Sequence, residues 1–143
     1  MHAPRFRTHV LPLFCALCAI SAINATALAE SPMNQTAESP EGAWRGQSVC
    51  VVRPSACHDE EALYRISRVA ANRLNLSGNK IVDGKEVNMG SGECDYDAKA
   101  GTVDCPLPGE NSLHLEIKGR SMQGLMTLHD GTVWRKISLR KMD

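Results

Sequence analysis

A run of polar side chains that could do chemistry follows the second of two closely spaced cysteines. Cys50 and Cys57 enclose a short segment that contains a proline, and His58, Asp59 and Glu60 come directly after Cys57. An imidazole beside two carboxylates is a set of groups that can bind a divalent metal or transfer a proton. These three residues are therefore the candidates for a metal site or a hydrolytic site.

The geometry of an extended chain argues against that chemistry. Successive side chains of a strand point to opposite faces, so His58 and Glu60 would share one face and Asp59 would lie on the other. Two ligands on one face do not complete a site, and nothing in the sequence brings His114 or His129 to join them. We interpret the run as an exposed polar turn after a crosslink, and we expect no catalytic residue, metal or other cofactor. A metal-binding or hydrolytic protein that uses these three residues remains an alternative.

Four cysteines lie beyond the N-terminal apolar run, and their spacing favours disulfides. Zinc knuckles separate cysteines by about two to four residues, whereas six and ten residues separate the two neighbouring pairs here. A hairpin with its loop at 98–101 would place Cys94 opposite Cys105, at a Cα separation of about 5 Å that a disulfide can bridge. Cys50 and Cys57 would then form the second bridge.

The first 29 residues have the layout of a secretory signal peptide. Two arginines precede an apolar run from 10 to 23, and Ala-Leu-Ala at 27–29 offers a cleavage site. The apolar run is shorter than the roughly 20 residues that a membrane-spanning helix needs. We therefore predict a signal peptide over 1–29, a secreted or periplasmic protein, and no membrane span after cleavage.

The composition of the remaining chain indicates one small domain. Residues 30–42 are polar, contain two prolines and show no apolar periodicity, so we expect a disordered leader. Residues 43–143 are enough for a single domain with a small core. The whole chain carries 16 basic and 16 acidic residues, and their interspersion leaves no basic footprint for nucleic acid.

Short segments with alternating apolar residues predict an all-β fold. Turn residues separate them at intervals of about ten residues, which is typical of a sandwich or barrel. About eight strands with short turns favour a small antiparallel up-and-down β-barrel, because closure removes exposed edges. Residues 59–74 also fit an amphipathic helix, which we keep as the alternative to a strand. The expected strands are 43–52, 62–69, 73–77, 80–82, 86–89, 93–97, 102–106, 113–118, 122–129 and 132–140.

The C-terminal hairpins predict which face is buried. Asp-Gly at 130–131 suits a two-residue turn, which pairs Met126 with Arg135 and Leu128 with Val133. The methionines on the inner face would suit an adaptable pocket. The predicted inner face consists of Leu113, Leu115, Ile117, Met122, Met126, Leu128, Val133, Ile137 and Leu139.

Several short motifs carry a resemblance to known proteins. A Gly-x-Trp start ending at Trp44, with Arg135 on a basic last strand, resembles the lipocalin (calycin) superfamily, and these two side chains could stack and close one barrel end. The motifs W-x-G-x-S-x-C at 44–50, C-H-D-E at 57–60 and D-G-T-V-x-R-K-I-S-L at 130–139 are similar to small exported bacterial proteins of unassigned function. The resemblance implies a lipocalin-like barrel and carries no activity with it.

These observations predict a non-catalytic binding protein. Its partner would be a small apolar ligand or an exported protein, and not nucleic acid. The alternative is an inhibitor of an exported protease, by analogy with small eight-stranded periplasmic inhibitors in which an N-terminal segment blocks the protease cleft. Residues 30–42 would play that part here.

Overall fold

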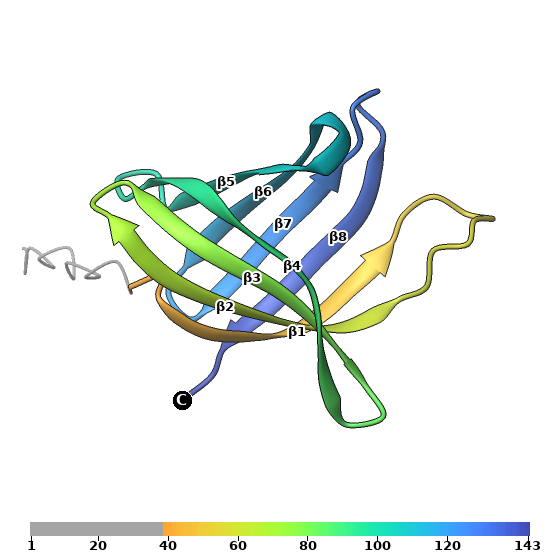
Figure 1. Cartoon of the computed structure of the whole chain (residues 1–143), viewed down its shortest axis with the longest axis horizontal. Coiled ribbons are helices and arrows are strands. Elements are labelled where there is room, and N and C mark those ends of the chain that lie inside the picture. Colours follow the sequence, from red (N-terminus) through yellow and green to blue (C-terminus); the bar gives the residue numbers. More distant parts are fainter. Residues whose placement is uncertain (1–38) are drawn as a thin grey trace, which may run out of the picture. The chain divides into compact units, whose positions relative to one another are not determined.

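Eight antiparallel strands form a closed barrel in the computed structural model, which describes residues 39–143 (Figure 1). Each strand pairs with the next along the chain, and β8 pairs with β1. The predicted all-β up-and-down barrel is therefore confirmed. The predicted signal peptide, 1–29, and most of the predicted leader lie outside the described residues. The strands are β1 Gly42–Cys50, β2 Glu60–Ala70, β3 Arg73–Val82, β4 Lys85–Asp97, β5 Thr102–Leu107, β6 Asn111–Lys118, β7 Ser121–Thr127 and β8 Val133–Lys141, with a short 3-10 helix, Pro108–Glu110, after β5.

Two long strands replace several of the predicted short ones. The segment 59–74, for which a helix was the alternative, contributes to β2 and β3, so the helical alternative is wrong. The break predicted at Gly78 and Asn79 is a shift of register between β3 and β4 instead of a turn, and β4 runs through Gly90 with a φ of 140°. A glycine inside a strand often marks such a bulge. Gly78 and Gly90 were therefore interpreted as turn residues although they lie within long strands.

The C-terminal register was predicted correctly except at its last turn. Met126 pairs with Arg135, as expected. Leu128 does not pair with Val133, because a register shift places Val133 opposite Thr127 and the Leu128 N–H donates to the Thr132 carbonyl. The loop is therefore longer than the two residues that the Asp-Gly pair suggested.

Both predicted disulfides are present. Cys94 and Cys105 bridge neighbouring strands with their Cα atoms 4.3 Å apart, and Cys50 and Cys57 close the loop between β1 and β2 with a Cα separation of 6.0 Å. The chain-entropy model assigns each crosslink about 2.5 to 3 kcal/mol of stability. Disulfides form and persist in oxidising compartments.

One end of the barrel, which we term the closed end, is filled by Trp44. Its side chain is fully buried, and its Nε1 donates a 2.8 Å hydrogen bond to the carbonyl of Pro40. The ammonium of Lys141 lies 5.6 Å from the ring centroid and also donates to the carbonyl of Ser39. Pro40, which the prediction placed in the leader, is itself fully buried.

The predicted stacking of Trp44 on Arg135 is wrong. The β1–β8 register places Lys141 opposite Trp44 and Arg135 opposite Cys50. Because the two strands are antiparallel, the start of β1 meets the end of β8, and Arg135 lies near the other end of the barrel. Lys141 takes the place over the indole ring that the prediction gave to Arg135.

Candidate functional site

A cavity of about 300 Å³ occupies the barrel at the end opposite Trp44, which we term the open end. Most of its lining is apolar, and the Cys94–Cys105 disulfide forms part of one wall. Polar groups enter from β1, β2, β3 and β8. The apolar side chains of the lining include Ala62, Leu76, Leu107, Leu113, Met126 and the ring of Tyr64, and the polar ones include Ser48, Glu60, Asn79 and Arg135.

Small residues create the space. A Cβ added at Gly78 would meet the Tyr64 ring at 3.7 Å, which is ordinary contact, and one added at Gly90 or Gly92 would meet nothing within 4 Å. Cavities of this kind are expected where interior positions of a small barrel lack bulky side chains. At the closed end, the indole of Trp44 is instead fully buried in the core.

β4 and β5 are paired over only part of their length, and the unpaired parts border the cavity. These strands pair over Asp95–Asp97 and Thr102–Asp104, and the preceding part of β4, from 85 to 93, is exposed. Residues 89–92 of β4 line the cavity on one side of this unpaired stretch. Residues 106–108, at the end of β5 and the start of the 3-10 helix, line it on the other side. The two strands therefore both border the cavity beyond the Cys94–Cys105 bridge.

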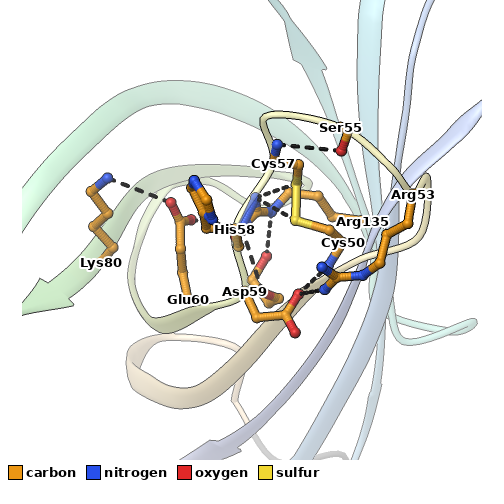
Figure 2. A network of polar contacts seen from close by, with 10 residues as sticks. Cys50, Arg53, Ser55, Cys57, His58, Asp59, Glu60, Lys80 and Arg135 are labelled. Carbon is orange, nitrogen blue, oxygen red and sulfur yellow. Dashed lines mark hydrogen bonds and ion pairs between the residues drawn. A yellow bond between two sulfur atoms is a disulfide. The ribbon is translucent and has the colours of Figure 1, made fainter.

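Arg135 organises the polar part of the open end (Figure 2). It is only 8% exposed. Its Nε donates to Ser48 Oγ at 2.8 Å, and its Nη2 donates to the His58 carbonyl at 2.7 Å and forms a 2.9 Å ion pair with Glu60. Its Nη1 lies 3.2 Å from the Sγ of Cys57. All three guanidinium nitrogens are therefore engaged, as a buried charge requires.

The loop between β1 and β2 is held by a second arginine. Asp59 Oδ1 accepts the Cys50 N–H at 2.8 Å and an Nη2 hydrogen bond from Arg53 at 2.5 Å (Figure 2). Together with the Cys50–Cys57 disulfide, these bonds tie both ends of the loop to the barrel rim. The loop itself extends beyond the strands in Figure 1, and Arg53 is exposed.

The three motifs of the sequence resemblance meet at Arg135. The first supplies Ser48 as an acceptor, and the second supplies the Cys57 sulfur, the His58 carbonyl and the Glu60 carboxylate. The third supplies Arg135 itself. The motifs therefore build one structural network at the open end, a convergence across three distant segments that the sequence does not reveal.

His58, Asp59 and Glu60 do not converge as a metal or hydrolytic site. Each carboxylate binds a different arginine, and Glu60 also lies 3.4 Å from Lys80 Nζ. His58 is exposed and contributes its backbone carbonyl. Within residues 39–143, no group of three or more His, Cys, Asp or Glu residues is arranged to hold a metal ion. The acids are paired rather than merely solvated, so the polar turn holds the loop in place.

Tyr64 is a cavity residue that was not among the candidates predicted from the sequence. It is 7% exposed and lines the cavity from β2. Burial raises the pKa of its hydroxyl to about 12, with a smaller lowering effect from Arg135 and a smaller raising effect from Glu60. The alternation of Ala62, Tyr64 and Ile66 on a strand was the signal that could have placed this side chain inside.

The two methionines predicted for an adaptable pocket have different roles. Met126 borders the cavity, whereas Met122 is fully buried in the core. A thioether that faces open space can change rotamer to fit a guest, and a packed one cannot without leaving a void. Only Met126 can therefore serve the pocket in the predicted way.

Comparisons with known proteins add no assignment. No family model, no curated protein and no solved structure matches the chain. In the part of the chain that the structure describes, no helix has the length and hydropathy to span a membrane.

Proposed function

We propose that the protein is a non-catalytic binding protein, exported from the cytoplasm, that holds a small apolar ligand in the cavity at the open end. The observation that carries the proposal is the cavity itself. Ligand pockets span roughly 300 to 1,000 Å³ and combine an apolar lining with a few polar groups. The cavity of about 300 Å³ lies at the small end of this range, which favours a compact ligand.

The charges around the cavity support binding over catalysis. A general acid or base needs a carboxylate or imidazole that is available to the substrate. The candidate carboxylates, Asp59 and Glu60, are instead engaged by Arg53 and Arg135. Export is supported by the two disulfides and by the signal-like N-terminal sequence.

Native mass spectrometry of the protein exported with its own signal tests this function. We expect the barrel to retain an organic molecule, and a Gly78→Leu variant, in which the new side chain enters the cavity, to lose it. Asn75→Leu is the matched control, because residue 75 lies on the same strand but is exposed. Retention by Gly78→Leu, or the absence of any bound molecule together with failure to bind added apolar probes, would contradict the proposal.

A second candidate function is inhibition of an exported protease. The observation that favours it is the exposed loop at 51–56, which is crosslinked at its base and held by the Arg53–Asp59 pair. A loop fixed in this way loses little entropy when it binds a partner. Replacing Arg53 with alanine would weaken an inhibitor of this type while leaving apolar ligand binding unchanged, so the two functions can be separated.

A further inference from the structure

The hydroxyl of Tyr64 is a polar group without a partner in the cavity. Among residues 39–143 it makes no hydrogen bond or ion pair, although the residue is only 7% exposed. In the same part of the chain, no fully enclosed side-chain nitrogen or oxygen lacks a partner. The Tyr64 hydroxyl is therefore not sealed by protein atoms, and it faces the open space that its side chain lines.

The other buried polar side chains of the lining are already engaged. Ser48 accepts a hydrogen bond from Arg135. Asn79 donates to the Leu63 carbonyl at 3.1 Å and accepts from Asn88 at 2.8 Å. Whereas Ser48 and Asn79 are hydrogen-bonded to the barrel, the buried Tyr64 side chain makes no hydrogen bond within residues 39–143 and is available to a guest.

The charges near Tyr64 determine which kind of group it would bind. At the open end, two positive side chains, Arg135 and Lys80, lie within ion-pair distance of the single carboxylate of Glu60. The influence of Arg135 on the hydroxyl also exceeds that of Glu60. A net positive surrounding favours a ligand atom with partial negative charge, so the phenol should act as the donor.

Building on the proposed function, we infer that the ligand is a compact, mostly apolar molecule with one hydrogen-bond-accepting oxygen, which receives a hydrogen bond from the Tyr64 hydroxyl. The apolar part would contact Leu76, Leu113 and Met126, which line the same cavity. A ligand without an acceptor would leave a buried donor unpaired, and that cost provides selectivity.

Two probes of the same shape test the inference. 2-Acetylnaphthalene carries a carbonyl, and 2-isopropenylnaphthalene replaces that oxygen with a CH₂ group. We expect the native protein to bind the ketone about 10-fold more tightly in calorimetric titrations. Tyr64→Phe should bind both probes equally, with its affinity for the alkene unchanged. Tyr96→Phe is the matched control, because Tyr96 is buried outside the cavity lining, and it should keep the preference.

The outcomes separate this inference from the function on which it rests. If the native protein binds neither probe, the proposed function fails and the inference fails with it. If it binds both equally, or if Tyr64→Phe keeps the preference for the ketone, the anchor role is overturned while ligand binding stands. Infrared spectra of the ketone bound to the native protein give an answer that needs no variant. A hydrogen bond from Tyr64 lowers the carbonyl stretching frequency relative to that in hexane, and an unshifted band contradicts the inference.

Discussion

The two ends of the barrel use a cation from the same strand in opposite ways. At the closed end, Lys141 lies over the ring of Trp44, whose bulk fills the interior. At the open end, Arg135 points inward and binds Ser48 and Glu60 beside a cavity. One cation of β8 therefore lies over an apolar side chain of β1 at the closed end, and the other belongs to a polar network at the open end.

This difference shows how a small barrel can keep a cavity. Apolar collapse stabilises an end by filling it, as Trp44 does. A buried ion pair with its hydrogen bonds satisfied holds a fixed geometry without filling the space next to it. The β1–β2 loop is anchored to Arg135 through the His58 carbonyl, so the rim is held in place around the opening. Four experiments can break or sharpen the comparison.

The largest effect is expected at the closed end. Trp44→Ala removes the largest fully buried side chain and should lower the free energy of unfolding by about 4 kcal/mol, because it leaves a large void. Trp134→Ala is the control, since this second tryptophan is partly exposed and should cost about 1 kcal/mol. Urea unfolding of both variants measures the difference. Equal losses would show that Trp44 is not what stabilises this end.

Breaking the network at the open end should cost somewhat less. Arg135→Met leaves the Glu60 carboxylate and the His58 carbonyl without their buried donor, and we expect a loss of about 3 kcal/mol. Glu60 then keeps only its 3.4 Å contact with Lys80, and adding Glu60→Gln removes the carboxylate that has lost its arginine, which should restore part of that stability. Denaturant unfolding of the single and double variants tests this. A double variant less stable than the Arg135→Met single variant would refute the assignment of the loss to the carboxylate that has lost its arginine.

Tyr64 should make stability fall at alkaline pH. Burial raises the pKa of its hydroxyl from about 10, the ordinary value of a tyrosine, to about 12 in the folded barrel. Because the pKa is raised in the folded state, the contribution of Tyr64 to the free energy of unfolding is fully present below pH 10. That contribution is lost as the pH rises toward 12. We expect a loss of about 2 kcal/mol over this window, and Tyr64→Phe should remove it. Denaturant unfolding of both proteins between pH 10 and 12 measures the difference. If the free energy of unfolding fell with pH equally in both, the raised pKa of the Tyr64 hydroxyl would be contradicted.

The smallest effect is expected for the cation at the closed end. Lys141→Met removes the contact with the Trp44 ring and the hydrogen bond to the Ser39 carbonyl, and should cost about 0.5 kcal/mol, since the ammonium is near solvent. Arg140→Met, one residue earlier on the exposed face, is the control and should change stability less. If Lys141→Met lowered the free energy of unfolding as much as Arg135→Met, the cations at the two ends would contribute equally to stability, and the comparison between the ends would fail.

The sequence by itself determined the features that depend on local patterns. The hairpin register that places Tyr96 opposite Val103 leads directly to the Cys94–Cys105 bridge, and the alternation of apolar residues in β6 to β8 predicts the inner face. These features involve residues close in the chain, whose pairing follows from the period of a strand and the length of a loop.

Only the tertiary structure decided how the site is assembled. The pairing of β1 with β8 places Arg135 opposite Cys50 and Lys141 opposite Trp44, and no turn between these strands sets that register. The cavity arises because Gly78 and neighbouring glycines have no side chain to fill it. The Tyr64 hydroxyl is available to a ligand because it makes no hydrogen bond within residues 39–143. Such features depend on the packing of distant strands, and a pattern read along the chain does not contain them.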